Sequence, residues 1–96
     1  MAADQLWLSS NYRRDGIGLH FTWKPLQAEV EALLPELEAA LLPLGARPHW
    51  GKLFAADAAQ LAPLYPRFED FRALARRLDP DGKFRNAFLD RTVFGA

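Results

Sequence analysis

The sequence predicts an α+β fold in which a small antiparallel sheet of about three strands packs against two to four helices. Three observations predict it: strict apolar and polar alternation over residues 17–23, leucines at helical spacing over residues 26–44, and a second apolar stripe over residues 68–78. A period of two is typical of a strand, and a period near 3.6 is typical of a helix. With 96 residues, the chain is predicted to form a single domain over residues 1–96.

Residues 6–8 and 17–23 are predicted to pair as an antiparallel hairpin. The first run is wholly apolar, and the loop between the runs ends in Asp15-Gly16, a dipeptide typical of turns. Side chains of a strand alternate between its two faces. The apolar residues of the second run therefore share one face: Ile17, Leu19, Phe21 and Trp23. Its polar residues share the other face: His20 and Thr22.

An amphipathic helix is predicted to follow the hairpin. Pro25 suits a first helical turn, where its missing N–H is no loss, and leucines at spacings of three and four continue to Leu44. Pro35 is expected to bend this helix or divide it, and Gly45 is expected to end it. Residues 47–52 then have the length and position of a return strand, the third of the predicted sheet.

Shorter helices are predicted in the C-terminal half. Asp57 is a candidate cap for a helix through about Leu64, and an apolar stripe indicates another helix over residues 67–78. The arginines of that second helix are interpreted as a solvated face: Arg72, Arg76 and Arg77. Asn86 is a candidate cap for one short helix in the tail.

Composition narrows the classes of partner. Twelve Lys and Arg balance twelve Asp and Glu, so there is no long-range field to attract nucleic acid, and neither nucleic acid nor a membrane segment is expected. The chain has no cysteine, and two histidines with scattered carboxylates have no metal-ligand spacing, so no metal site is predicted. The sequence also lacks a Gly-rich phosphate loop and a Gly-x-Ser-x-Gly elbow. We expect a cytoplasmic protein.

Half of the residues are hydrophobic, although the chain is short and contains seven prolines. This apolar content indicates a surface that another polypeptide covers, or equally a well-filled small core. Self-association is the further consequence expected of an uncovered apolar surface.

His20 and Thr22 are the first pair of candidate site residues. An imidazole can exchange a proton near neutral pH, and a hydroxyl two residues further along a strand lies roughly 6 to 7 Å away, a spacing suited to a polyol. The alternative interpretation is that both are solvated side chains on an open sheet face.

Residues 47–52 carry the second group of candidates. The Lys52 ammonium can anchor hydroxyls or stabilise an oxyanion, and His49 and Trp50 can line a sugar pocket. The alternatives are an exposed lysine at the end of a strand and ordinary packing of His49 and Trp50 beneath the first helix.

Several stretches resemble the C-terminal part of the FAD-dependent aldonolactone and alditol oxidases, which include the D-arabinono-1,4-lactone oxidase group and bacterial xylitol or sorbitol oxidases. The resemblance covers nearly the whole chain in order, and its most specific parts are His49-Trp50-Gly51-Lys52 and the downstream Asp79-Pro80-x-Gly82-Lys83-Phe84. Residues 6–9, 18–23 and 64–71 also match.

The resemblance implies a cap domain, an antiparallel sheet flanked by helices that supplies the substrate side of a flavin pocket. It makes His20 and Lys52 catalytic candidates, adds Thr22, His49 and Trp50 as substrate contacts with Lys52, and leaves Asn86 as the only candidate for a cofactor contact. The implied reaction oxidises a polyol or sugar-lactone CH–OH group: hydride passes to FAD, a base takes the hydroxyl proton, and O₂ reoxidises the flavin to give H₂O₂.

The flavin-binding region of that family has no counterpart in this sequence, and neither does the Glu-x-Arg pair of its cap strand. We therefore expect a C-terminal fragment, a split-gene product or a remnant that is inactive alone and has a separately encoded FAD domain as its partner. The competing hypotheses are a stand-alone carbohydrate-binding or protein-interaction module without redox activity, and a domain without a ligand.

Overall fold

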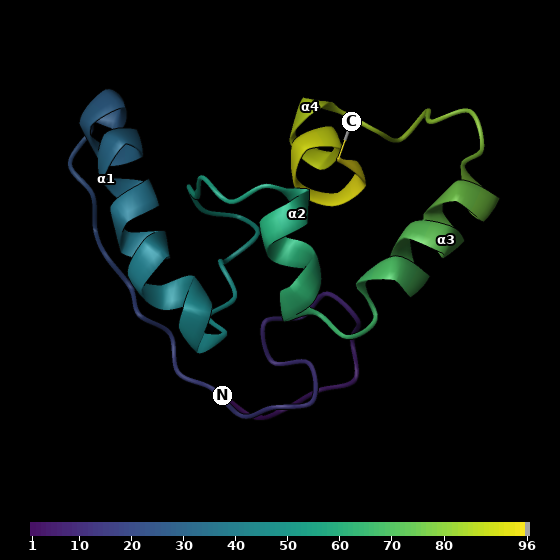
Figure 1. Ribbon diagram of the computed structural model, residues 1–96, viewed down its shortest axis with the longest axis horizontal. Coiled ribbons are helices and arrows are strands. Elements are labelled where there is room, and N and C mark those ends of the chain that lie inside the picture. Colours follow the sequence, from purple (N-terminus) through teal and green to yellow (C-terminus); the bar gives the residue numbers. More distant parts are fainter. Residues whose placement is uncertain (96) are drawn as a thin grey trace.

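The computed structural model describes residues 1–95, and its regular elements are helices (Figure 1). Helix α1 spans Gln27–Leu41 and continues as a 3-10 turn, Leu42–Leu44. Helix α2, Ala58–Leu61, likewise continues as a 3-10 turn, Ala62–Leu64, and α3 spans Phe68–Leu78. Helix α4, Ala87–Leu89, runs directly into a π-helical turn, Asp90–Phe94.

The predicted antiparallel sheet is wrong, because no β-strand forms anywhere between residues 1 and 95. The one β feature of that range is an isolated parallel bridge between Asp4 and Tyr12. Residues 17–23 instead connect the N-terminal loop to α1 without regular structure and make no backbone hydrogen bond to another described residue. A strand is stable only when a neighbour satisfies its backbone groups, and alternation within one segment cannot supply that neighbour.

The two other predicted strands are turns. Ser9 N–H donates to the Leu6 carbonyl at 3.0 Å, which folds residues 6–9 back on themselves. Lys52 N–H donates to the His49 carbonyl at 3.0 Å, so the predicted return strand at residues 47–52 reverses direction instead. Both corrections have the same cause, since a turn of four residues satisfies its own backbone groups locally and needs no partner strand.

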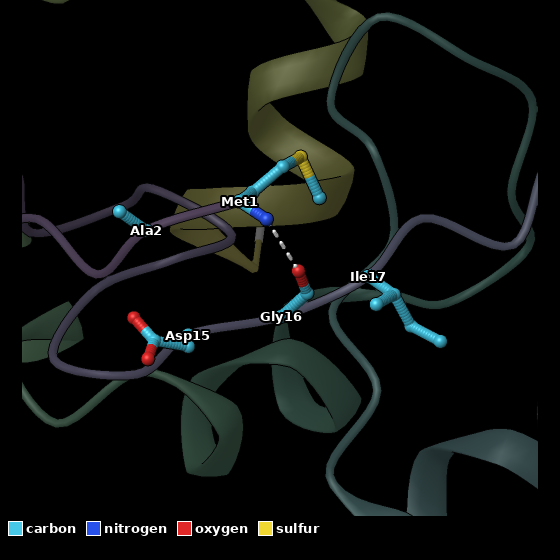
Figure 2. Close-up of a pocket in the computed structure, with 5 residues that line it drawn as sticks. All are labelled: Met1, Ala2, Asp15, Gly16 and Ile17. Carbon is cyan, nitrogen blue, oxygen red and sulfur yellow. Dashed lines mark hydrogen bonds between the residues drawn. The ribbon is translucent and has the colours of Figure 1, made fainter.

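The N-terminal loop is closed by pairs of backbone hydrogen bonds. Asp4 N–H donates to the Asn11 carbonyl and Arg13 N–H donates to the Asp4 carbonyl, each at 2.9 Å. Nearer its base, the Met1 amino group and the Gly16 carbonyl lie 2.9 Å apart, and Gly16 N–H donates back to the Met1 carbonyl (Figure 2). These contacts give residues 1–16 a defined shape without helix or strand.

The predicted helices are confirmed with adjusted ends. Helix α1 begins two residues after Pro25 and passes through Pro35 as one element, so the predicted division does not occur. Gly45 ends the following turn at φ 82°, a left-handed conformation that favours glycine. Asp57 caps α2 in a reciprocal capping box with Gln60, which satisfies two backbone N–H groups.

The core lies where α2 meets the π turn, at the centre of Figure 1, with α1 and α3 to either side. Its largest fully buried side chains are those of Leu61, Tyr65, Phe68 and Val93. Phe54 and Ala56 complete the buried cluster, and Leu42 and Trp50 pack against it. A core assembled from short elements leaves much of the N-terminal segment and α1 outside it.

Tyr65 places an unsatisfied polar atom in this core. Its hydroxyl is buried and makes no hydrogen bond within the described residues, and burial raises the pKa of the phenol above its usual value of 10. We expect Tyr65→Phe to raise the free energy of unfolding by about 1 kcal/mol, because it removes an unsatisfied buried polar atom. Urea unfolding at neutral pH measures the difference.

The effect of Tyr65→Phe on stability is expected to depend on pH. Burial raises the pKa of Tyr65 in the folded state above its unfolded value. The stability that the neutral phenol contributes to the parent protein is therefore fully present below about pH 10, and it is lost as the pH rises through the folded-state pKa. The gap in stability between Tyr65→Phe and the parent should therefore widen above about pH 10. Parallel alkaline curves for the two proteins would count against this account.

Candidate functional site

The cluster around residues 49–52 forms a tight turn with an internal imidazole contact. Gly51 N–H donates to His49 Nδ1 at 3.0 Å, and Lys52 N–H donates to the His49 carbonyl. A Cβ at position 51 would lie 3.2 Å from His49 Cε1, so glycine leaves room for the ring. Because Nδ1 accepts a hydrogen bond, the neutral His49 ring carries its proton on Nε2 and can present an N–H donor outward.

Trp50 fastens this turn to the core. Its indole N–H donates to the Leu8 carbonyl at 2.8 Å, and its ring meets Phe54 edge-on at a centroid distance of 6.1 Å and Tyr65 at 5.7 Å. Trp50 is only partly exposed, whereas the neighbouring His49 and Lys52 are exposed. The turn thus presents an imidazole and an ammonium to solvent from an anchored base.

Arg47, two residues before the turn, binds backbone carbonyls of two other segments. Its Nε donates to the Leu64 carbonyl at 2.8 Å, and one of its terminal nitrogens lies 3.0 Å from the Tyr12 carbonyl. Its guanidinium also stacks over the Tyr65 ring at 4.9 Å. Burial, followed by the nearby Arg14 charge, lowers the pKa of Arg47 from its usual value. Arg47 therefore joins three segments that are distant in sequence.

The second candidate pair lies on the irregular segment between the N-terminal loop and α1. His20 and Thr22 are both exposed, and no hydrogen bond or ion pair among residues 1–95 involves either side chain. No such contact joins them to His49, Trp50 or Lys52. The structure therefore brings together the three residues of the turn but does not bring His20 and Thr22 to them.

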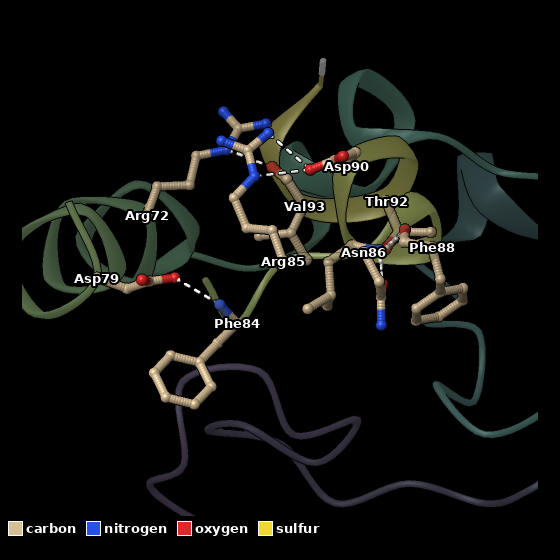
Figure 3. Close-up of polar contacts among 10 residues, drawn as sticks. Arg72, Asp79, Phe84, Arg85, Asn86, Phe88, Asp90, Thr92 and Val93 are labelled. Carbon is tan, nitrogen blue, oxygen red and sulfur yellow. Dashed lines mark hydrogen bonds and ion pairs between the residues drawn. The ribbon is translucent and has the colours of Figure 1, made fainter. Parts of the chain in front are cut away.

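Asn86 has a local role in this structure. As predicted, it caps α4, and its side-chain oxygen accepts a hydrogen bond from Leu89 N–H at 2.8 Å (Figure 3). In the same region, Asp79 accepts from Phe84 N–H, and Arg85 pairs with Asp90. The helix cap uses the side-chain oxygen of Asn86 as an acceptor, and its amide N–H groups can donate to another group.

Arg72 departs from the interpretation of a solvated helix face. It donates to the Val93 carbonyl, which links α3 to the π turn (Figure 3). It also pairs with Glu69 on its own helix. Arg76 and Arg77 are exposed, as the interpretation requires. The sequence carried no signal for the Arg72 contact, because its acceptor is a backbone carbonyl 21 residues away.

Two shallow hollows open on the surface. The larger, about 580 Å³, is lined by residues of the N-terminal loop, shown in Figure 2: Met1, Ala2, Asp15, Gly16 and Ile17. The smaller, about 360 Å³, lies between residues 5–8 and the α3 residues Phe71 and Leu74. Neither of these two hollows is lined by a candidate site residue.

Neither of these two hollows fits the flavin that the resemblance implies. FAD carries an anionic diphosphate, and the only charged side chain lining either hollow is the carboxylate of Asp15. Within residues 1–95, no three His, Cys, Asp or Glu side chains gather into a potential metal site. No helix in that range has the length and apolar character needed to cross a membrane.

Comparison with known proteins relates the chain to sugar oxidoreductases. Residues 1–92 match the family described as D-arabinono-1,4-lactone oxidase. The chain is 52% identical over 92 residues to an alditol oxidase from a Streptomyces species, a match that covers 93% of this chain and 21% of the relative.

More distant relatives align over the same extent. An L-gulonolactone oxidase from Scyliorhinus torazame is 33% identical over 95 residues, which cover 96% of this chain and 22% of the relative. An L-gulono-1,4-lactone dehydrogenase from Mycobacterium tuberculosis is 35% identical over 94 residues, covering 96% and 21% respectively. The chain thus spans about a fifth of the length of these relatives. From the match over residues 1–92, this chain belongs to the D-arabinono-1,4-lactone oxidase family.

Proposed function

We propose that this chain is the substrate-side portion of an FAD-dependent oxidoreductase that oxidises a CH–OH group of a polyol or sugar lactone with O₂ as acceptor. The observation that carries the proposal is the family match over residues 1–92, supported by 52% identity to a Streptomyces alditol oxidase. In this proposal residues 1–96 form one cytoplasmic domain that is inactive without a flavin-bearing polypeptide.

The turn at residues 49–52 supplies the chemistry that the proposal needs from this chain. The exposed Lys52 ammonium donates hydrogen bonds to substrate hydroxyls, and the His49 Nε2–H provides a second donor from the same turn. Trp50 keeps both on a rigid base through its bond to Leu8. In the proposal His20 accepts the substrate hydroxyl proton and Thr22 contacts a neighbouring hydroxyl.

The test replaces the matching fifth of the Streptomyces alditol oxidase with residues 1–92 of this chain. We expect the chimera to show flavin absorbance and to form H₂O₂ from xylitol or sorbitol. Lys52→Ala in the chimera should lower kcat/KM by about tenfold to a hundredfold, because a hydrogen bond from a charged donor contributes about 1.5 to 3 kcal/mol.

Lys24→Ala is the matched control, because Lys24 is also an exposed lysine but lies outside the turn and outside the stretches that carry the resemblance. It should leave kcat/KM unchanged. A chimera that folds and binds flavin yet oxidises neither polyols nor sugar lactones would refute the proposed function. Equal losses from the two lysine variants would refute the assignment of Lys52.

A carbohydrate-binding module without redox activity is the second candidate. The observation that favours it is that His49 and Lys52 are already exposed on an anchored turn in the isolated chain. This alternative predicts chemical-shift changes at both residues when the chain alone is titrated with xylitol. The oxidase proposal predicts that such changes need the flavin-bearing polypeptide.

A further inference from the structure

His49 accepts hydrogen bonds from both backbone N–H groups that follow Trp50. Gly51 N–H donates to the Nδ1 atom of its ring at 3.0 Å, and Lys52 N–H donates to its carbonyl at 3.0 Å. The imidazole thereby takes the place of an Asn or Asp side chain in an Asx-turn, which accepts from the backbone N–H two residues further on. One residue therefore fixes the backbone that leads into Lys52.

Trp50 holds one side of this turn, and His49 holds the other. The indole N–H of Trp50 donates to the Leu8 carbonyl at 2.8 Å, and its ring packs against buried aromatic side chains. The Lys52 side chain is exposed and forms no hydrogen bond or ion pair with any residue from 1 to 95. The position of its ammonium therefore depends on the backbone of the turn, and that backbone depends on the ring of His49.

The His49 ring can accept from Gly51 N–H only while it is neutral. A neutral imidazole has one acceptor nitrogen, whereas both nitrogens of an imidazolium carry a proton and only donate. Protonation at Nδ1 would set two N–H groups against each other, so the contact with Gly51 would become repulsive. The hydrogen bond therefore belongs to the neutral ring and is lost as the pH falls through the titration of His49.

No charged neighbour competes for the His49 ring among residues 1–95. The carboxylates on the segments packed around Trp50 accept from other residues, and the arginines there donate to backbone carbonyls. None of the charged or titratable side chains of these segments forms a hydrogen bond or ion pair with His49: Asp4, Glu38, Arg47, Lys52, Tyr65 and Arg91. Gly51 N–H is thus the partner of the ring.

We propose that His49 is a positioning residue for Lys52, and that its neutral ring holds the turn in the form that presents the Lys52 ammonium to a substrate hydroxyl. Protonation of the ring releases the backbone of Gly51 and Lys52 and so weakens substrate binding at low pH. The substrate part of this inference rests on the proposed function. The pH-dependent turn does not, because it is a property of residues 49–52 in the chain alone.

The first test follows the full chain alone by NMR while the pH is lowered from about 8 to about 5. The Gly51 and Lys52 amide resonances should shift together with the ring protons of His49. Protection of the Gly51 amide against hydrogen exchange should fall by about threefold to tenfold, the change that one neutral hydrogen bond supports. His49→Asn is the matched variant, because its side-chain oxygen can accept from the same N–H but does not titrate. It should keep the Gly51 amide protected at every pH.

Two further signals in the same spectra serve as controls. The indole N–H of Trp50 should keep its resonance position, which shows that the core stays folded. If the indole signal is lost together with the protection of Gly51, general unfolding explains the effect and overturns the inference. His20 still titrates in His49→Asn, so a shift of the turn amides that persists in this variant would assign the effect to another group and also overturn it.

The second test measures kcat/KM for xylitol in the oxidase chimera that carries residues 1–92. The ratio of the parent value to the His49→Asn value should fall by about threefold to tenfold as the pH drops from about 8 to about 5, and the titration of every other group cancels in this ratio. With Lys52→Ala in both proteins the ratio should not depend on pH, because His49 acts through Lys52. A role of His49 that is structural alone would give no pH dependence of the ratio in either background.

The two tests separate this inference from the proposed function. Amides of Gly51 and Lys52 that do not follow the His49 ring overturn the inference whatever the chimera does. If they follow it but the kcat/KM ratio is constant with pH, His49 does not position Lys52 and the assignment is refuted. If the chimera binds flavin yet oxidises neither polyols nor sugar lactones, the proposed function fails, while the NMR titration still decides whether the ring of His49 controls the turn.

Discussion

Replacing Arg47 with alanine is expected to lower the free energy of unfolding by about 3 to 5 kcal/mol, because it removes several charge-assisted hydrogen bonds at once. The guanidinium reaches the carbonyls of Leu64 at 2.8 Å and Tyr12 at 3.0 Å, and lies near those of Ser9 and Ser10 at 3.4 and 3.3 Å. Without it the carbonyls of Leu64, Ser10 and Tyr12 lose this donor, whereas that of Ser9 still accepts from Tyr12 N–H. The Arg47 link between the N-terminal loop and Leu64 is lost as well.

Two variants make this prediction specific. Arg47→Lys should recover less than half of the loss, because an ammonium on a flexible stem cannot reproduce the fork of donors that spans both segments. Arg76→Ala, at an exposed arginine of α3, should change stability by less than about 0.5 kcal/mol. Urea unfolding followed by tryptophan fluorescence measures all three, and an Arg47→Ala loss below about 1 kcal/mol would contradict the role assigned here.

Replacing Glu38 with alanine is expected to lower the free energy of unfolding by about 2 to 4 kcal/mol. This buried carboxylate on α1 accepts hydrogen bonds from Ala55 N–H at 3.0 and 3.1 Å and from Ala56 N–H at 2.8 Å. No other contact of comparable geometry satisfies those two N–H groups among the described residues. Loss of these hydrogen bonds would leave the buried Ala56 N–H and the partly buried Ala55 N–H unpaired just before the cap of α2, and would remove this link between α1 and the core.

Glu38→Gln tests whether the loss of stability comes from the hydrogen bonds. Its amide oxygen can still accept a hydrogen bond from a backbone N–H, whereas its NH₂ group cannot. It should lose about half as much stability as Glu38→Ala. Glu36→Ala removes an exposed carboxylate from the same helix and should be nearly neutral. If Glu36→Ala and Glu38→Ala destabilise the chain equally, the effect comes from helix propensity or charge rather than from the buried hydrogen bonds.

The helices could be predicted because their determinants are local. The Asp57 and Asn86 caps, the left-handed Gly45 and the apolar stripe of α3 all act within a few residues of the element that they define. Pro35 does not divide α1, which continues through it as one element. Leu34 and Glu38, on either side of Pro35, are buried against the rest of the chain, and these tertiary contacts support the helix.

The sheet was mispredicted for the opposite reason. Alternation over residues 17–23 describes side-chain faces correctly, yet a strand also needs a partner, and none of the other described segments lies in register beside it. The candidate site likewise has one part set by local sequence and one part that depends on long-range pairing. The sequence placed His49, Trp50 and Lys52 close together because they are neighbours in the chain, whereas the position of His20 and Thr22 depends on pairing that this chain does not provide alone.

The sequence by itself determined the family, the helices and the identity of the candidate residues, because motifs, caps and periodicity are properties of short segments. Only the tertiary structure decided that residues 47–52 form a turn, that Trp50 anchors it, and that Arg47 and Glu38 connect distant segments. These contacts join residues 17 to 42 positions apart. Such pairs meet only when the chain folds, because their geometry depends on packing across the whole domain and not on the spacing of residues along it.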